Sequence, residues 1–493
     1  MGTALEAIFS FPFWGFIGLV LVLISQVIVA ARVIMSRRSV GETLAWIMLV
    51  LAIPVLGWVL YLLVGELRLG SYRAKKIQQL ARSVKNRLNT LDQYGTSIPW
   101  QQLGSDCEQL ARAGRQMLQV PALPGNKLEL FDQWQKVYDQ LIRDIDSAQI
   151  NCDFQFYIWH PQGRTSEVVS AIERACQRGV TCRILVDSLG SWPFLHSQDA
   201  QRLRDAGAHV LEALPSRLWR LPFVRYDLRM HRKIIVVDDR LAWTGSLNLV
   251  DPRYFKREAG VGQWIDAMTR VQGPAVEALA ITFQTDWQIE SEASVDHLPD
   301  LTGDQLLQEC GHCVVQVLPS GPAYSVEAIE QLLITAIYMA REELVITSPY
   351  FVPSESLTMA LSSAARRGVR VMVIVPAKVD SLLVRYASGA FKGDLLDAGV
   401  QIALFNGGLL HTKSVTIDRK TCLFGTLNMD PRSLRLNFEI TLAVYDPLFT
   451  SQLRQLQERY LQQSVWLDAE QWRKRPIALR FLENLAQLLS PLL

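Results

Sequence analysis

The sequence predicts an α/β protein: two tandem α/β domains that pair as a pseudo-dimer, preceded by two transmembrane helices. Two observations support this prediction. The first is a pair of long apolar segments near the N-terminus. The second is a long internal repeat in which helix-like segments alternate with short buried strands, a pattern that folds into a sheet covered by helices. The chain has 493 residues, enough for several domains.

The apolar segments at residues 8–29 and 44–64 contain no charged residue, and each is about as long as the 20 residues that cross a bilayer core. The first segment lacks the basic start of a cleaved signal peptide, so we expect residues 1–66 to form a two-span anchor. Pro54 and Gly57 are tolerated in such a helix. The seven cysteines follow no disulfide framework, which favours a reduced, cytoplasmic body.

Residues 67–120 are predicted to form a polar connector, followed by two similar halves over 121–295 and 296–475. Each half contains an amphipathic segment, a buried strand and a helix that ends at a glycine before a second strand. Residues 476–493 have apolar side chains at helical spacing. We expect an amphipathic C-terminal helix that either lies in a membrane interface or packs on the body.

The strongest signal is a duplicated motif, His-x-Lys-x4-Asp, followed after six residues by Gly-Ser/Thr-x-Asn. Average residue usage gives one such match odds on the order of one in a million per histidine, so two matches among seven histidines are no coincidence. The two copies supply the candidate site residues His231, Lys233, Asp238, Ser246 and Asn248, and His411, Lys413, Asp418, Thr426 and Asn428.

Alternate residues of a strand share a face, so the histidine and lysine of each motif are expected to point the same way. A two-residue turn at Asp239 and Arg240 would place Lys233 opposite Ser246 and the histidine opposite the asparagine. The second copy would have the same register. Each half then offers an imidazole, an ammonium, a hydroxyl and an amide in one patch.

This set of groups suits a phosphodiester, because ammonium, amide and hydroxyl groups bind its non-bridging oxygens. One histidine can attack phosphorus and form a phosphohistidine, while the other protonates the leaving alcohol and then activates the incoming hydroxyl. Lysines beside the histidines would repel a cation, so we expect neither a metal nor a cofactor.

Four acidic residues near the motifs have alternative roles. Asp238 and Asp418 lie at strand ends, where a turn or an ion pair is as plausible as direct catalysis. Glu258 and Glu439 follow the two asparagines and could orient the imidazoles.

The formal net charge of +2 argues against a nuclease, which needs a broad basic surface. Basic and aromatic residues alternate between Arg217 and Arg229, which suits anionic lipid headgroups or, alternatively, a solvated loop. A hydrolase that passes the intermediate to water would use the same residues and stays an alternative. A catalytically dead scaffold would be expected to lose part of one motif, and both motifs are intact.

The two motifs resemble those of the phospholipase D superfamily. The apolar N-terminal segments and the sequences at 157–161, 245–255 and 437–439 are similar to those of bacterial cardiolipin synthases, over essentially the whole chain. The resemblance implies two phospholipase D-like domains in a multi-pass enzyme of the bacterial inner membrane. It also implies an enzyme that joins two phosphatidylglycerol molecules and releases glycerol, without nucleic-acid partners; an oligomer stays open. The implied catalytic residues are His231, Lys233, Asp238, His411, Lys413 and Asp418.

Overall fold

The computed structural model of the chain describes residues 11–36, 40–93, 97–215, 225–291 and 308–488. The chain divides into two compact units. The first, here the helical unit, contains residues 1–74 and 216–227. The second, here the body, contains residues 75–215 and 228–493.

The helical unit consists of apolar helices. They are α2 (Phe11–Met35), α3 (Val40–Ala52), α4 (Pro54–Leu60) and the π-helical turn η1 (Tyr61–Gly65). Within the described residues, the Gly15–Met35 part of α2 is the one helix long and apolar enough to cross a membrane. Helix α5 (Ser71–Asp92) follows and continues into the body.

The second apolar segment, residues 44–64, is not one straight helix. It breaks before Pro54, which has no N–H to donate to the Val50 carbonyl. The side-chain amide of Gln26, from α2, donates to that carbonyl instead, at 3.1 Å. A Cβ atom at Gly57 would come within 2.6 Å of the α3 backbone, so α4 folds back closely on α3. The prediction of a second full span is therefore not confirmed, because the segment forms two shorter helices.

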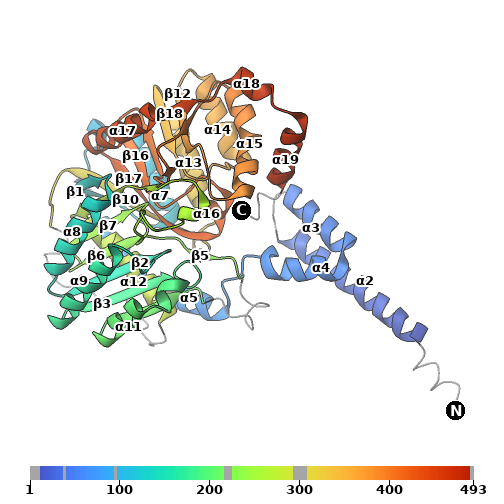
Figure 1. The fold of residues 1–493 in the computed structure, drawn as a ribbon, viewed down its shortest axis with the longest axis horizontal. Coiled ribbons are helices and arrows are strands. Elements are labelled where there is room, and N and C mark those ends of the chain that lie inside the picture. Colours follow the sequence, from blue (N-terminus) through green and yellow to red (C-terminus); the bar gives the residue numbers. More distant parts are fainter. Residues whose placement is uncertain (1–10, 37–39, 94–96, 216–224, 292–307, 489–493) are drawn as a thin grey trace, which may run out of the picture. The chain divides into compact units, whose positions relative to one another are not determined.

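The body is built on a 16-stranded sheet whose two halves contain the same series of strands (Figure 1). The strands of the first half are β1 (Ala122–Phe131), β2 (Asn151–Phe156), β3 (Thr181–Asp187), β4 (His209–Ala213), β6 (Ile234–Val237), β7 (Leu241–Gly245) and β9 (Met268–Gln272). Those of the second are β10 (Cys313–Ser320), β11 (Glu343–Thr347), β12 (Arg370–Pro376), β13 (Gln401–Phe405), β15 (Ser414–Ile417), β16 (Thr421–Gly425), β17 (Asn437–Tyr445) and β18 (Ser464–Trp466).

From the centre outward, the first half has the order β1-β9-β7-β6-β2-β3-β4, and the second has β10-β17-β16-β15-β11-β12-β13 with β18 at its edge. Strands β1 and β10 pair antiparallel at the centre, so the two halves form one continuous sheet. Three short strands complete the body: β5 (Arg229–Met230), β8 (Trp264–Ile265) and β14 (Leu409–Leu410). The predicted α/β fold with two similar halves is confirmed.

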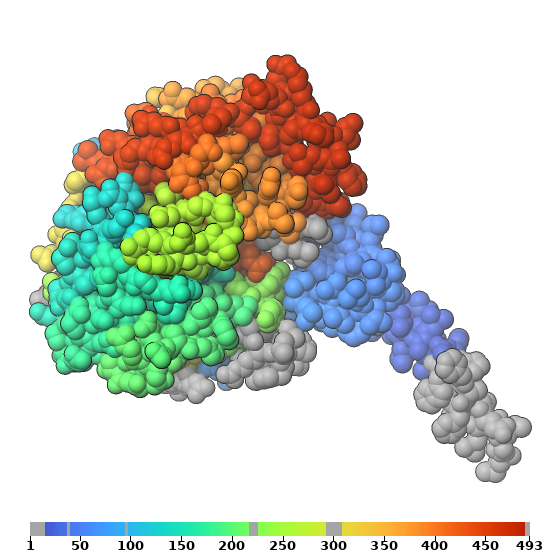
Figure 2. Space-filling view, in the orientation of Figure 1, coloured from blue at the N-terminus to red at the C-terminus, as the bar shows by residue number. Residues whose placement is uncertain are grey.

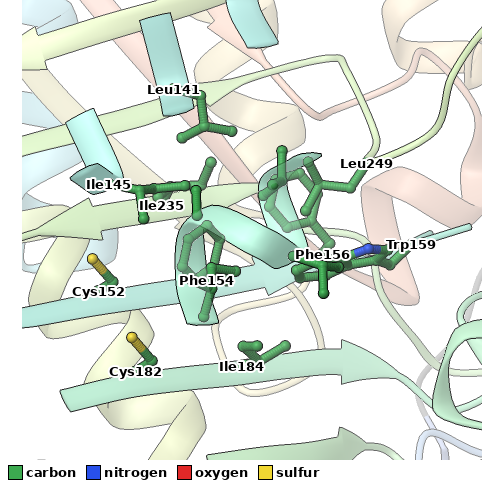
Figure 3. Packing of buried hydrophobic residues seen from close by; sticks show 14 of the residues in the cluster. Leu141, Ile145, Cys152, Phe154, Phe156, Trp159, Cys182, Ile184, Ile235 and Leu249 are labelled. Atoms are coloured by element: carbon green, nitrogen blue, oxygen red, sulfur yellow. The ribbon is translucent and has the colours of Figure 1, made fainter. Parts of the chain in front are cut away.

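Helices cover both faces of the sheet. The main ones are α7 (Ser105–Leu118), α8 (Trp134–Asp146), α9 (Thr165–Gln177), α11 (Gln198–Asp205), α12 (Ala275–Glu290), α13 (Ala328–Met339), α14 (Glu355–Arg366), α15 (Leu382–Asp397), α17 (Pro447–Gln462), α18 (Ala469–Arg473) and α19 (Ile477–Leu488). In the first half, Leu141 and Ile145 of α8 pack on Phe154 of β2 and Ile235 of β6 (Figure 3). Helix α12 covers the other face, where Gln155 of β2 donates to its Asp286.

The hairpin that follows each motif has a longer turn than predicted. Val237 lies opposite Leu241, which leaves three residues in the turn instead of two. Asp238 and Asp239 both adopt left-handed conformations, with φ of 52° and 51°, and this accounts for the added residue. The second hairpin has the same register and the same pair of left-handed residues. The predicted register was therefore wrong by one residue in both halves.

Candidate active site

Each motif histidine lies just before its own strand, on a segment that binds the opposite half of the body. His231 follows β5, which pairs with the start of β17, and its N–H donates to the Phe438 carbonyl at 2.9 Å. His411 follows β14, which pairs with β8, and its N–H donates to the Ile265 carbonyl at 2.8 Å. The boundary between the halves therefore fixes both histidines.

The histidine side chains also contact the opposite half, because each imidazole binds a carboxylate from that half. Nδ1 of His231 lies 2.8 Å from Oε2 of Glu439, and Nδ1 of His411 lies 2.7 Å from Oδ1 of Asp266. All four side chains are buried. A carboxylate on Nδ1 holds the proton there and leaves Nε2 with a lone pair that can act as nucleophile or base.

The two motif hydroxyls hold these carboxylates in place. Thr426 Oγ1 donates to Glu439 at 2.5 Å, and Ser246 Oγ donates to Asp266 at 2.6 Å. Each hydroxyl also accepts the backbone N–H of the residue after the carboxylate. A hydroxyl has a single hydrogen, so neither has one to offer a phosphate oxygen in this arrangement. Their contacts indicate positioning of the carboxylates instead of the predicted substrate binding.

The two lysines are buried beside the histidines. Lys233 Nζ donates to the His231 carbonyl at 2.9 Å, and Lys413 Nζ donates to the His411 carbonyl at 2.6 Å. An ammonium has three hydrogens, so hydrogens remain on each lysine for an anion. Burial lowers the pKa of Lys233 to about 8, although Glu439 opposes the shift, and burial also holds the pKa of Lys413 well below its usual value. A bound phosphodiester anion would favour the charged form of both.

Burial also lowers the pKa of both motif histidines to about 4, against the opposing effect of their carboxylates. Burial alone would raise the pKa of Asp266 and Glu439, but the paired histidine and the nearby lysine outweigh it and lower both values. The carboxylates are therefore ionised and the imidazoles neutral at neutral pH. Neutral imidazole is the form that a nucleophilic attack on phosphorus requires.

The side-chain amides of the two motif asparagines are also buried in the site. Asn248 accepts the Ile158 N–H through Oδ1, and its buried Nδ2 has no partner among the described residues. Asn428 bonds Ser433 at 3.1 Å through one end of its amide, and the other end is likewise buried without a described partner. Each amide can therefore donate to a ligand once its orientation is chosen accordingly.

Two rings that the motif analysis missed lie against the imidazoles. The ring of Tyr157 is 4.9 Å from that of His231, and the ring of Trp264 is 4.3 Å from that of His411. Such rings exclude water from the imidazoles. Trp264 lies two residues before Asp266, which the motif analysis also did not predict. The sequence around these two residues does not resemble any segment of the second half.

Asp238 and Asp418 have the same environment in both halves, away from the imidazoles. The Asp238 carboxylate accepts the backbone N–H groups of residues 149–151, at 2.7 to 3.1 Å. The Asp418 carboxylate accepts those of residues 341–343, at 2.8 to 2.9 Å. Each ties the motif hairpin to the loop before the neighbouring strand, which matches the turn role and not direct contact with phosphorus.

The prediction that Glu258 orients a histidine is wrong. Glu258 is exposed in the short 3-10 helix Arg257–Ala259, and Asp266 occupies the place that it was given. The reason is an unequal loop: Asp266 lies 20 residues after Ser246, whereas Glu439 lies only 13 after Thr426. Alignment by spacing from the asparagines therefore selected a residue inside the longer loop.

Metal-type ligands come together elsewhere in the body. Among the described residues, His312, Cys313 and Asp446 bring their ligand atoms within 4.8 Å of one another. Glu439 pairs with Ser320 at the other end of β10, roughly 20 Å away at the usual rise per residue. Burial raises the pKa of the Cys313 thiol to about 12, and Asp446 Oδ1 already caps α17. This group is a poor metal centre and is remote from the histidines.

Two predicted lipid-facing segments are described only in part. Of the basic and aromatic stretch from Arg217 to Arg229, residues 217–224 lie outside the described residues. Of the C-terminal segment, α19 covers Ile477–Leu488, and 489–493 lie outside.

Comparison with known proteins gives consistent matches. The family model described as "Cardiolipin synthase, PLD-like domain" matches residues 141–287 and 333–461, and the model "Phospholipase_D-nuclease N-terminal" matches residues 24–66. The crystal structure of phosphatidylserine synthase from Haemophilus influenzae Rd KW20 covers 78% of this chain and 100% of its own, with a TM-score of 0.57. Its sequence identity is 14%, so it shows a shared fold only.

Curated relatives are much more similar. Cardiolipin synthase A of Pectobacterium carotovorum subsp. carotovorum (strain PC1) is 44% identical over 94% of this chain and 96% of its own length. Cardiolipin synthase A of Yersinia pseudotuberculosis serotype O:1b (strain IP 31758) is 43% identical over the same shares. With these relatives and both halves matched by the family model, the chain belongs to the cardiolipin synthase family of phospholipase D-like enzymes.

Proposed function

We propose that this site transfers a phosphatidyl group from one phosphatidylglycerol to the hydroxyl of another, producing cardiolipin and glycerol. The chain is a phosphatidyltransferase of the cardiolipin synthase family. The observation that supports the reaction best is the exchange of partners, in which the carboxylate of each half orients the histidine of the other. Two neutral imidazoles with free Nε2 atoms, beside two ammonium groups, suit a phosphodiester.

In the first step, Nε2 of one histidine attacks phosphorus. A P–N bond forms and the P–O bond to the glycerol headgroup breaks. The other histidine, protonated when the anionic substrate binds, gives its proton to the departing glycerol oxygen. In the second step that histidine takes the proton of the incoming lipid hydroxyl, whose oxygen attacks phosphorus and breaks the P–N bond. The pair is thereby restored, with one proton shared between coupled groups.

The remaining residues stabilise and position. Lys233, Lys413 and the amides of Asn248 and Asn428 would bind the non-bridging oxygens, where charge develops in the transition state. Ser246 and Thr426 would hold the carboxylates, and Asp238 and Asp418 would hold the motif hairpins. A metal is not part of this mechanism, because two ammonium groups supply the positive charge.

The reaction is tested by lipid mass spectrometry on purified full-length protein given phosphatidylglycerol alone. We expect cardiolipin and free glycerol in equal amounts, and reversal of the reaction by excess glycerol, since one phosphodiester replaces another. Phosphatidic acid as the main product in a bilayer would instead support the hydrolase alternative, in which water resolves the intermediate.

We also propose that residues 1–66 are a two-span anchor in the bacterial inner membrane, with a cytoplasmic body. Residues 44–64 are uncharged, and several of their side chains, including Met48 and Leu56, are exposed. Gln26 satisfies the carbonyl that Pro54 leaves free, as a helix break inside lipid requires. Cysteine labelling in intact and permeabilised cells tests this topology. Termini on the same side support two spans, and termini on opposite sides support one span followed by a re-entrant helical pair.

Within the rest of the chain we propose a connector over 67–120, phospholipase D-like domains over 121–295 and 296–475, and a C-terminal helix over 476–493. The central pairing of β1 with β10 supports a division of the body between these two strands. Because the halves share one site, we expect the two domains to unfold as one cooperative unit. A single calorimetric transition for the body would support that expectation.

A further inference from the structure

Helix α19 packs on the body through a face that contains an acidic residue, whereas an amphipathic helix of a soluble protein packs through its apolar face. Its buried residues are Glu483 and Ala486, which lie against α15. Glu483 pairs with Arg475 at 2.5 Å and packs over Gly389 of α15, where a Cβ atom would collide with it. The acidic side of the helix therefore faces inward.

The apolar side faces outward. Ile477, Phe481, Leu485 and Leu488 are 81%, 66%, 47% and 77% exposed, and their spacing places them on one face of the helix. Figure 2 shows α19, in dark red, at the surface of the body. Surface helices of soluble proteins turn their apolar face to the core, and a continuous exposed apolar stripe marks an interaction surface.

A series of contacts also connects helix α19 to the active site. Ala486 packs with Val384 and Ala387 near the start of α15, so the end of α19 lies at the start of α15. The same cluster includes Tyr350, whose hydroxyl donates to Asp380 at 2.8 Å.

A short series of contacts leads from there to a catalytic histidine. Asp380 pairs with Lys256 at 3.0 Å, and the Lys256 ammonium lies 5.5 Å from the centre of the Trp264 ring. That ring lies against His411. Asp380 belongs to the second half and Lys256 to the first, so this ion pair crosses the boundary between the halves.

We propose that the exposed face of α19 docks on the surface of a bilayer that contains anionic phospholipid, and so holds the body and its active site close to the lipid substrate. The inference rests on the proposed function in one respect, that the substrate is a membrane lipid. It adds a membrane contact within the body that does not depend on residues 1–66. Arg480, exposed at the margin of the apolar face, suits the anionic headgroups.

The dimensions favour a bilayer over a second copy of the chain. Helix α19 has 12 described residues and is therefore about 18 Å long. A stripe of four side chains on so short a helix is well below the roughly 800 Å² per partner that a stable protein interface buries. It is sufficient for a helix that lies in the interface plane and inserts one apolar face.

The test compares two forms of the substrate for the full-length variant Phe481→Gln/Leu485→Gln. The first is phosphatidylglycerol in vesicles, and the second is dihexanoyl phosphatidylglycerol dispersed as monomers. We expect kcat/KM on vesicles to fall by about fivefold or more, because the docking face is lost, and kcat/KM on monomers to stay unchanged. The matched control is Met359→Gln/Leu448→Gln, which changes two exposed apolar residues (65% and 64%) on α14 and α17 and is expected to retain both activities.

Three outcomes would overturn the proposal. They are unchanged activity on vesicles, an equal loss on both substrates, and an oligomer in the unsubstituted protein that the double variant dissociates. A second measurement does not depend on activity: an environment-sensitive fluorophore at Leu485→Cys, in a Cys310→Ser background, with spin-labelled lipids as quenchers. Strong quenching there, and weak quenching for a label at Glu470→Cys on α18, is expected. Equal quenching contradicts docking even if the protein makes no cardiolipin.

Discussion

The two halves of the body differ where they are least repetitive, in the segment that supplies a carboxylate to the other half. The second half reaches Glu439 by a short route along β17, with Asp430 capping the one-turn helix Pro431–Arg435 on the way. The first half reaches Asp266 through a loop seven residues longer, which also carries Lys256 and Trp264. The carboxylate, its hydroxyl and its histidine nevertheless have nearly the same geometry in both.

This comparison shows which features the duplicated site must keep. The length of the loop and the identity of the acid can differ, because a strand from the opposite half fixes the end of each loop. The exchange of carboxylates cannot differ, because without it each imidazole loses the group that sets its tautomer. Neither half therefore contains both a motif histidine and the carboxylate that contacts it.

The largest expected effect comes from either histidine. His231→Ala and His411→Ala should each reduce turnover by about 10⁴-fold or more, and the double variant should be little worse, because the pair acts as a unit. Cardiolipin formation measured on folded, purified variants checks this. A single variant that keeps a third of the activity would contradict a shared site and make the two halves independent.

Removal of one exchanged carboxylate should have the next largest effect. Asp266→Asn and Glu439→Gln should each lower kcat by roughly 10²–10⁴-fold, because the amide can no longer hold the Nδ1 proton. The isosteric changes preserve the packing, and melting curves can verify that. Glu258→Gln is the matched control and should retain full activity. If Glu258 were essential and Asp266 dispensable, the contact between Asp266 and His411 would not be the one that catalysis requires.

The pH dependence distinguishes the imidazoles from the lysines. Burial lowers the pKa of both histidines to about 4, so we expect activity to be lost through protonation of both imidazoles, which leaves no nucleophile, only as the pH drops towards that value. The pKa of Lys233 is lowered to about 8, so its positive charge, and with it binding of the phosphodiester, is lost as the pH rises through 8. We expect about a tenfold decrease per pH unit on that side. An alkaline limb above pH 10 would show that Lys233 is not perturbed in the working enzyme.

Much of the fold followed from local patterns in the sequence. The buried β-branched runs of residues 183–187 and 371–375 lie within β3 and β12, because burial of such runs depends on their own composition. The two strands need no information from the rest of the chain. Glu439 was predicted to orient an imidazole because it follows Asn428 closely, but the imidazole that it contacts, His231, lies 208 residues away in the other half.

Other features depend on tertiary contacts that no local pattern records. Asp266 is separated from His411 by 145 residues, and only the pairing of β14 with β8 brings them together. The left-handed turn at Asp238 is stabilised by amide groups of another loop, so its length could not be inferred from the hairpin alone. Pro54 was predicted to be tolerated within one span, and the division into two helices depends on the close approach at Gly57.

The motif aspartates should affect stability more than chemistry. Asp238→Ala or Asp418→Ala removes the acceptor of three backbone N–H groups, at a cost of about 1–3 kcal/mol in the free energy of unfolding. Differential scanning calorimetry should show a lower Tm, with activity per folded molecule reduced only a fewfold. Asp397→Ala, at an exposed ion pair with Arg473, is the control and should leave Tm nearly unchanged. A stable Asp418 variant without activity would restore a direct catalytic role.

Chelation should have the smallest effect. In the proposed mechanism Lys233 and Lys413 supply the positive charge that a divalent cation would otherwise provide, and both ammonium groups donate to the carbonyls of the motif histidines. A cation beside them would be repelled, so we expect exhaustive treatment with EDTA to leave cardiolipin formation unchanged. The group of His312, Cys313 and Asp446 lies at the far end of β10, so chelation there is not expected to affect the histidines either. Activity that EDTA abolishes and that Mg²⁺ or Zn²⁺ restores would mean that the lysines do not supply the charge, and the mechanism would need a metal at the phosphate.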